Sequence, residues 1–199
     1  MPSSRREQLI EAADRLFCTR GYHATGIDRI LAEAGVAKMT LYKHFGSKDE
    51  LILAALRARD QWFRNHLARE LAQRTADPAE RLVVLFDVID EFCHGAEFNG
   101  CMFANAAAEF PEPENPIHAA AVEHKRLFTA YLRKQAEAAG ASDPAALADR
   151  LALLVEGVFA TANVRGPDGV AAQAKELAQG LVREATADTT TSASHALSV

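Results

Sequence analysis

Three cysteines are the whole thiol content of this chain of 199 residues. Cys18, Cys93 and Cys101 are odd in number and lack metal-ligand spacing, so a disulfide framework is not expected. Hydrophobic runs are short as well, and none approaches the ~20 residues that span a bilayer. The first residues carry charges throughout and lack the apolar segment of a signal peptide. These absences favour a cytoplasmic protein with reduced thiols and no membrane partner.

Common catalytic motifs are missing too. The chain has no Gly-rich phosphate loop, no HExxH and no G-x-S-x-G. One alternative stays open, because Glu91 and His94 have the Glu-x-x-His spacing of carboxylate-bridged di-metal helix bundles, with Asp87 and Asp90 nearby. No second Glu-x-x-His occurs, so a solvated charge stripe is the favoured interpretation. We therefore predict that the protein is not an enzyme and has no catalytic residue, metal site or cofactor.

Charge is distributed unevenly along the chain. Residues 1–48 hold eight Lys/Arg and five Asp/Glu, a net charge of +3, whereas residues 49–199 have a net charge of −8. A basic N-terminal segment joined to an acidic remainder indicates that only the first segment meets a polyanion.

Apolar residues recur at helical spacing along almost the whole chain, without a strand pattern. We predict an all-α fold of about nine helices, with a helix-turn-helix domain over 1–47 and a larger helical domain over 48–186. The polar, Ser/Thr/Ala-rich segment 187–199 is predicted to be a disordered tail. The expected helices lie between Ser4 and Gly21 and over 27–34, 37–44, 48–73, 78–94, 101–110, 116–139, 144–164 and 168–185.

Capping patterns mark the starts of the first helices. Ser4, Thr25 and Ser47 are each followed three residues later by an acid and are the expected N-caps. Gly35 ends the second helix and leads through a tight turn into the third. Three helices, the last two joined by a Gly-containing turn, are typical of a helix-turn-helix unit.

The third predicted helix, in the stretch GVAKMTLYKHF, is amphipathic. Leu41 and Phe45 are four residues apart and share a face that can pack on the first two helices. The polar face is left free to meet a partner. It carries Lys38, Met39, Tyr42 and Lys43, with Thr40 and His44 between the two faces.

Such a helix fits the major groove of DNA, where base edges carry a hydrogen-bonding code. Lys38 and Met39, at its start, are candidates to contact bases. The candidates for phosphate contacts are Thr40, Tyr42, His44 and Lys48, with Thr25 and Arg29 facing the opposite strand from the second helix. The same pattern also suits a small helical subdomain with ordinary solvated lysines, so spacing and charge alone leave both interpretations open.

The order of these features resembles the N-terminal domain of the TetR family of transcriptional regulators, from about Glu7 to Leu56. The matching stretch is IEAADRLFCTRGYHATGIDRILAEAGVAKMTLYKHFGSKDELI. The features that match in order are Phe17, Gly21, Tyr22, Thr25, Ala34-Gly35-Val36, Leu41-Tyr42, Phe45 and Lys48. The resemblance is strong over about a quarter of the chain and extends elsewhere only to the helical pattern.

The resemblance implies roles for individual residues in DNA binding. Ala37 departs from the family pattern, which often has Ser or Thr as the cap of the third helix, and this weakens the cap by about 1 kcal/mol. Met39 departs as well, since Gly or Pro is frequent there, and this bears on the DNA sequence that is read. The implied phosphate contacts come from Thr25, Thr40, Tyr42, His44 and Lys48, and the implied positions near bases are Arg29, Lys38 and Met39.

The resemblance also implies that residues 48–186 form a ligand-binding and dimerisation domain, and that a homodimer binds a roughly palindromic DNA operator. The predicted interface is formed by the last two helices, about 144–164 and 168–185, where Gly157 and several alanines allow close approach. An intramolecular core would satisfy the same pattern. The apolar positions are Leu147, Leu151, Leu154, Val155, Val158 and Phe159 in the first of these helices, and Leu177, Leu181 and Val182 in the second.

A small-molecule effector pocket among the middle helices is implied as well. For each aromatic candidate, core packing is the competing interpretation. Asn105 and Glu109 stand out, because they are four residues apart on a helix with little charge and need polar partners if buried. The candidate wall residues are Trp62, Phe63, His66, Phe86, Ile89, Cys93, Phe103, Asn105, Glu109, Phe128 and Tyr131.

These features together predict a DNA-binding transcriptional regulator. Repression relieved by a small-molecule effector is the favoured mode, and activation is the alternative. A thiol-based redox sensor at Cys101 also stays open, against inert packing of this thiol.

Overall fold

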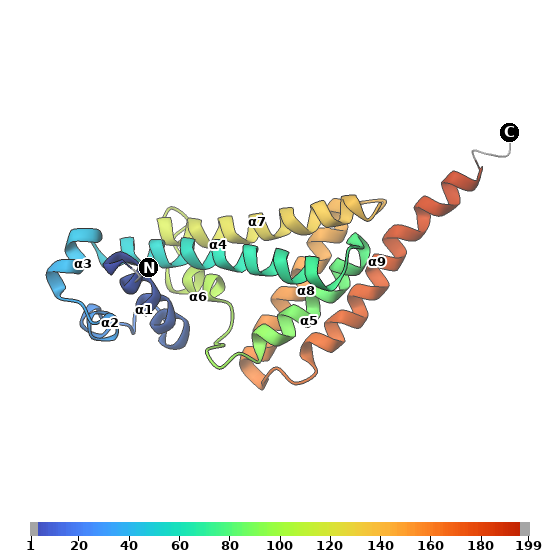
Figure 1. Ribbon diagram of the computed structural model, residues 1–199. Coiled ribbons are helices and arrows are strands. Elements are labelled where there is room, and N and C mark those ends of the chain that lie inside the picture. The colour runs from blue at the N-terminus through green and yellow to red at the C-terminus, as the bar shows by residue number, and fades with distance from the viewer. Residues whose placement is uncertain (1–3, 196–199) are drawn as a thin grey trace. The chain divides into compact units, whose positions relative to one another are not determined.

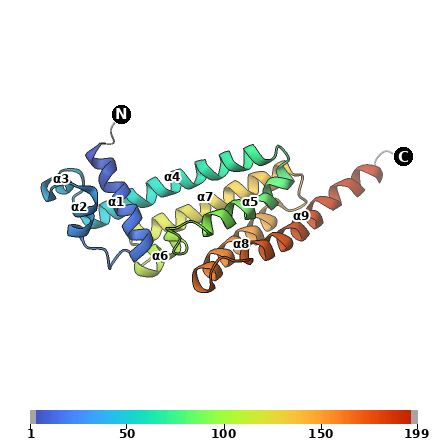
Figure 2. The same cartoon turned by 60° about the horizontal axis from the view of Figure 1, so that its bottom comes forward.

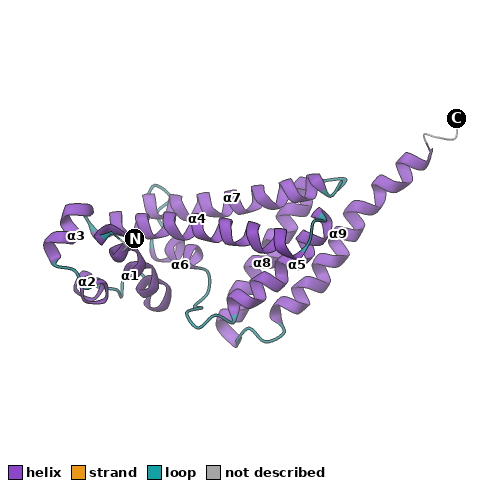
Figure 3. Cartoon of the chain, in the orientation of Figure 1, coloured by secondary structure: helices purple, strands orange, loops and turns teal. Residues whose placement is uncertain are grey.

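The structure is a computed structural model that describes the backbone of residues 4–195 and the side chains of residues 4–187. Every regular element in these residues is a helix and none is a strand (Figure 3), which confirms the predicted all-α class. In chain order the helices are α1 (Arg5–Arg20), α2 (Ile27–Ala34), α3 (Lys38–His44), α4 (Lys48–Arg74), α5 (Pro78–Cys93), α6 (Met102–Glu109), α7 (Pro116–Ala138), α8 (Pro144–Arg165) and α9 (Val170–His195) (Figure 1).

Side-chain caps account for the starts of α1 and α4. Ser4 caps α1 as predicted, since its Oγ accepts from the Glu7 N–H and the Glu7 carboxylate accepts from the Ser4 N–H. Ser47 accepts from the Glu50 N–H at 3.1 Å, while the Glu50 carboxylate turns to the Gly46 N–H at 2.7 Å. Both starts therefore follow from sequence over four or five residues.

The predicted Thr25 cap is wrong. Gly26 is the N-cap of α2, and no side chain caps this helix. Thr25 is fully buried, and its Oγ1 donates to the Gly21 carbonyl at 2.7 Å. The hydroxyl therefore bonds within the turn between α1 and α2 and does not cap α2.

The chain packs into two compact units. The first combines Met1–Phe63 with Ala96–His124, so α6 and the start of α7 share one core with α1, α2, α3 and the start of α4. Figure 2 shows the end of α1 beside α6. Leu9, Leu41 and Leu51 are completely buried in this core. This packing boundary is distinct from the functional boundary predicted at residue 47, which stays a prediction.

The second unit combines Arg64–Gly95 with Lys125–Val199. Its helices α5, α8 and α9 pack on one another, and Leu85, Phe86 and Ile89 of α5 are completely buried. Across the helices that the structure describes, none combines the length and the apolar character that a membrane crossing requires.

The last helix extends further than predicted. The α9 backbone is helical to His195, beyond the expected end near residue 185. Its last turns overlap the segment 187–199 that the composition predicts to be a disordered tail. Residues 196–199 of that tail lie outside the described part of the chain.

Candidate nucleic-acid interface

The third helix presents its polar face to solvent. Leu41 and Phe45 are 0% and 4% exposed and hold α3 against the rest of residues 1–47, which we call the head. Met39 is 80% exposed and Tyr42 is 46% exposed, although each carries a large apolar surface. Apolar surface beside cations suits base edges and phosphates together. The exposed cationic or titratable neighbours on α3 are Lys38, Lys43 and His44.

The remaining predicted DNA contacts differ in their exposure. Arg29 is exposed on α2, and Thr40 is half-buried between the two faces of α3. Thr25 does not join them, because its side chain is fully buried and its hydroxyl is bonded to the Gly21 carbonyl. This conformation does not offer the Thr25 hydroxyl to a phosphate, and the residue positions the turn before α2 instead.

Lys48 connects the start of α4 to the turn between α1 and α2. Its Nζ donates to the Tyr22 carbonyl at 2.6 Å. Burial lowers the pKa of Lys48, against the opposing effect of the Asp49 and Glu109 carboxylates. An ammonium group has three N–H donors, so the predicted phosphate contact is compatible with this bond and stays a prediction.

Glu109, the last residue of α6, binds the same turn. Its Oε1 accepts from the Tyr22 N–H at 2.8 Å, and its Oε2 accepts from the His23 N–H at 2.6 Å. The same Oε2 lies 2.8 Å from His23 Nδ1. We call these contacts the Glu109 junction. Gly21 suits the place, because its φ is +82° and an added Cβ would lie 2.8 Å from the Glu109 Oε1.

The partners of Glu109 are therefore backbone and side-chain groups of the head, although the sequence analysis placed this residue in an effector pocket. Burial raises the pKa of Glu109, but the donors of His23 and Tyr22 together bring it below its usual value of 4.5. A carboxylate that accepts hydrogen bonds on both oxygens stabilises the folded turn directly.

Aromatic packing strengthens the same region. Tyr22 is completely buried, and its hydroxyl donates to the Met102 carbonyl at 2.9 Å. Phe110 stacks on the His23 ring at 4.8 Å and meets the Tyr22 ring edge-on at 6.1 Å. Burial raises the pKa of Tyr22 far above its usual range. The sequence did not reveal this contact between α6 and the head, because the bonded residues are 80 to 87 positions apart.

Two of the predicted pocket residues surround a histidine that the sequence analysis did not select. The His124 ring lies parallel to Phe103 with centroids 3.6 Å apart, and Phe63 meets it edge-on at 5.7 Å. His124 Nδ1 lies 2.8 Å from Asp60 Oδ1, and His124 is only 6% exposed. The first unit thus contains a buried polar pair between aromatic rings.

The other candidates of the first unit are more exposed or are occupied by structural contacts. Trp62 is 46% exposed, and the Arg59 guanidinium lies 5.2 Å from the centre of its ring. Asn105 Nδ2 donates to the Asn99 carbonyl at 3.1 Å and so fixes the turn before α6.

The remaining candidates belong to the second unit. Cys93 is buried, and burial raises the pKa of its thiol to about 12, so it is unreactive near neutral pH. His66 contacts Arg69 and Glu70 of its own helix. The predicted pocket wall is thus divided between the two units, and its membership stays a prediction. The candidates in this unit are His66, Phe86, Ile89, Cys93, Phe128 and Tyr131.

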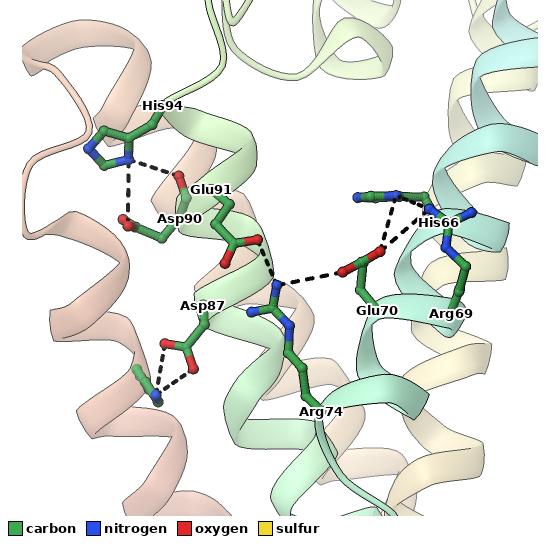
Figure 4. Close-up of polar contacts among 9 residues, drawn as sticks. His66, Arg69, Glu70, Arg74, Asp87, Asp90, Glu91 and His94 are labelled. Carbon is green, nitrogen blue, oxygen red and sulfur yellow. Dashed lines mark hydrogen bonds and ion pairs between the residues drawn. The ribbon is translucent and has the colours of Figure 1, made fainter.

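The charge stripe of α5 forms ion pairs with its surroundings (Figure 4). The pairs are Asp87 with Lys175, Glu91 with Arg74, and His94 with Asp90 and Asp168, at 2.6 to 3.5 Å. Among the side chains of residues 4–187, no three His, Cys, Asp or Glu groups are placed to hold one metal ion. Each of the four side chains of the stripe therefore has a partner within the protein.

Two protein-family models match the chain. The model described as "Bacterial regulatory proteins, tetR family" matches residues 9–55, and "Tetracyclin repressor-like, C-terminal domain" matches residues 78–178, about half of the chain. The chain belongs to the TetR family. Members of the TetR family are transcriptional regulators and not enzymes, so the chain is a DNA-binding transcriptional regulator.

Solved and curated TetR-family proteins agree with this assignment. A TetR-family transcriptional regulator from Streptomyces coelicolor is 31% identical, with a TM-score of 0.85 over 92% of this chain and 96% of that one. The transcriptional activator FasR of Mycolicibacterium smegmatis is 37% identical over 54% of this chain and 49% of its own. The transcriptional repressor KstR2 of Mycobacterium tuberculosis is 39% identical over 42% of each chain. The chain thus spans half or less of these two relatives.

Proposed function

We propose that this TetR-family regulator binds a palindromic operator as a homodimer, represses transcription and is released by a small-molecule effector. The observation that carries the DNA-binding part is the exposed face of α3, where Met39 and Tyr42 lie among cations. This face enters the major groove with Lys38 and Met39 near base edges. The proposed phosphate contacts are Thr40, Tyr42, Lys43, His44 and Lys48, with Arg29 joining from α2.

Repression is the proposed sign of regulation. KstR2 carries the name of a repressor, whereas FasR carries that of an activator, and both resemble this chain. Bound DNA alone does not distinguish the two modes. A reporter fused to the target promoter does so, since deletion of the regulator raises expression under repression and lowers it under activation.

Replacing Tyr42 by alanine tests the role of α3. The variant loses an exposed ring and its hydroxyl without disturbing the buried face, so we expect normal folding and about tenfold weaker operator binding, equivalent to ~1.4 kcal/mol. Tyr42→Phe separates the hydroxyl from the ring. The measurement is fluorescence anisotropy with DNA from upstream of the protein's own gene, with random DNA as competitor at several salt concentrations.

Val122→Ala is the matched control, because Val122 is 55% exposed on α7 and lies outside the proposed interface. If the wild type bound upstream and random DNA with equal affinity at every salt concentration, the upstream DNA would contain no operator that the head recognises. Equal affinity of Tyr42→Ala and the wild type would remove α3 from the proposed interface.

The proposed dimer uses the exposed side of α8 and α9. Most residues that the sequence analysis selected there, such as Leu151 and Val158, are buried in the second unit and form its core. Leu153, Val164 and Leu177 are instead 73%, 86% and 60% exposed. Residue spacing alone did not separate the two sides, because both sides of α8 are apolar.

Replacing Leu153 by glutamate tests this interface. A charge placed on a surface that is buried in a dimer loses its hydration, so we expect the dimer dissociation constant to rise at least about tenfold. Analytical ultracentrifugation over a concentration series measures it. Val122→Glu, a charge on an exposed position of α7, should leave the constant unchanged. A wild-type monomer at all concentrations would refute the dimer.

The proposed release passes through α6. Because α6 shares the core of the first unit and holds Tyr22 and His23, a displacement of α6 also displaces the turn before α2. An effector that binds within residues 48–186 and favours a different position of α6 would therefore lower operator affinity. The reduction equals the ratio of the effector's affinities for the two positions.

A further inference from the structure

A cleft between the head and the start of α4 shares His44 with the proposed DNA interface, and none of its lining residues belongs to the predicted effector pocket. It is formed by the start of α1, the end of α3 and the first turns of α4, all within the first unit. Figures 1 and 2 show α1 running across the start of α4. The volume of the cleft is about 520 Å³, which falls within the ~300–1,000 Å³ of small-molecule sites.

The floor of the cleft is apolar. Ile10 of α1 and Leu53 and Ala54 of α4 are half-buried and pack on the core of the unit. The Phe45 side chain at the end of α3 is buried beside them. Ala58 is exposed one turn after Ala54 and leaves that end of the cleft open. An apolar floor of this kind favours an occupant with an apolar part.

Two arginines and a histidine border this floor. Arg6, Arg57 and His44 contribute to the lining, and the Arg6 guanidinium lies 5.3 Å from the centre of the Phe45 ring. As far as the structure describes the chain, neither arginine forms a salt bridge or donates to an acceptor. The carboxylate of Glu50, the acid in the lining, is occupied by the Gly46 N–H at 2.7 Å. The rim of the cleft therefore carries two guanidinium charges against one carboxylate, a net charge of +1 with His44 counted as neutral.

We propose that this cleft binds a small amphiphilic anion, a molecule with an oxyanion head and an apolar tail, and that its binding opposes DNA binding. Guanidinium groups pair with carboxylate and phosphate oxygens through two parallel hydrogen bonds. The tail covers the side chains of the floor, which a bare inorganic anion or a DNA phosphate leaves exposed to water.

The opposition to DNA rests on the function proposed above. His44 lies both in the cleft lining and among the proposed phosphate contacts of α3. An anion held beside His44 occupies space that a DNA phosphate would otherwise use. Ligand and DNA therefore compete, and each weakens the binding of the other by the same factor.

The probe is octanoate, which has both a carboxylate and an apolar tail. The controls are 1-octanol, which has the tail without the charge, and acetate, which has the charge without the long tail. Titration of the full-length, isotope-labelled protein without DNA is followed by two-dimensional NMR. We expect octanoate to shift the amide signals of Ile10, Leu53, Ala54 and Ala58 with saturation, and the other two compounds to bind at least about fivefold more weakly. Saturable shifts confined to residues 64–95 and 125–187 would overturn the proposal.

Two variants locate the binding. Arg57→Gln removes one rim charge, and we expect about three- to fivefold weaker octanoate binding, as for an exposed ion pair. Ala58→Leu fills the open end of the cleft without changing charge and should weaken binding about tenfold or more. Arg20→Gln, an exposed arginine at the far end of α1, should bind octanoate like the wild type. Equal affinity in Ala58→Leu and the wild type would place octanoate elsewhere.

The competition is measured separately, by anisotropy of labelled duplex DNA with equal concentrations of octanoate or acetate. We expect octanoate to weaken DNA binding by the wild type at least about threefold more than it weakens binding by Ala58→Leu. An equal effect on both would overturn the competition. Because the NMR titration contains no DNA, failure of the DNA-binding proposal and failure of the cleft proposal give different results.

Discussion

Replacing Glu109 by alanine should destabilise the protein by about 2 to 3 kcal/mol. The variant removes a charged acceptor from two backbone donors, the N–H groups of Tyr22 and His23, at 2.8 and 2.6 Å. A hydrogen bond to a charged group contributes ~1.5–3 kcal/mol, and partial exposure of His23 to water reduces the sum of the two. Urea unfolding followed by circular dichroism measures the change.

Local and acid-dependent readouts separate the Glu109 junction from general damage. The amide protons of Tyr22 and His23 should exchange faster in the variant, while those of α5 and α8 are unchanged. The carboxyl pKa is lower in the folded state than in the unfolded one, so its stabilisation is present above pH 4.5 and is lost as pH falls through the folded pKa. Glu109→Gln should therefore differ from the wild type at pH 7 and approach it in acid.

Glu112→Ala is the matched control for this prediction. Glu112 is exposed in the turn after α6, and its carboxylate has no acceptor role in the described residues. Its replacement should change the free energy of unfolding by less than about 0.5 kcal/mol. If Glu109→Ala behaves like Glu112→Ala, water replaces the carboxylate at no cost, and α6 is held to the head by aromatic packing and the Tyr22 hydroxyl bond to Met102.

The helices could be predicted from the sequence because their signals are local. Ser4, Asp77 and Asp143 each accept a hydrogen bond from an N–H two or three residues later, and each stands at the expected helix start. The same logic failed at Thr25, where the Gly21 carbonyl four residues earlier competes for the hydroxyl. Such a choice depends on the shape of a turn, which spacing alone does not determine.

The contacts of α6 could not be predicted in the same way. The sequence singles out Glu109 as a polar residue on an apolar helix, but the donors that it binds are 86 and 87 positions away. The exposed positions of α3 were easier, because Leu41 and Phe45 fix one face and leave Tyr42 on the other. Long-range pairing decides whether a selected residue meets a ligand or the chain itself, and periodicity contains no information on it.

The second large effect concerns the buried pair of Asp60 and His124. His124 Nδ1 lies 2.8 Å from Asp60 Oδ1, and the two side chains are 7% and 15% exposed. Removing one member of a buried pair costs about 3 kcal/mol, because the other keeps its desolvation cost and loses this contact. We expect Asp60→Ala and His124→Phe each to lower the free energy of unfolding by about this amount.

The double variant is expected to recover much of this loss. With both polar groups replaced, the Phe at position 124 can still stack on Phe103, so the coupling energy should be about 2 kcal/mol or more. Urea unfolding of the wild type, both single variants and the double variant measures it. Asp149→Ala, on the exposed side of α8, serves as the control for loss of a surface carboxylate.

Additive losses would instead show that each group is held by other neighbours and that the coupling energy of the pair is small.

The same set of variants decides between two roles for the aromatic rings around the pair. Phe63 and Phe103 were expected in the effector pocket, yet both contact His124 within the first unit. A double variant that is stable, binds the operator and no longer responds to the effector would place the pair in the effector site. A double variant that still responds to the effector would show that the pair only stabilises the first unit.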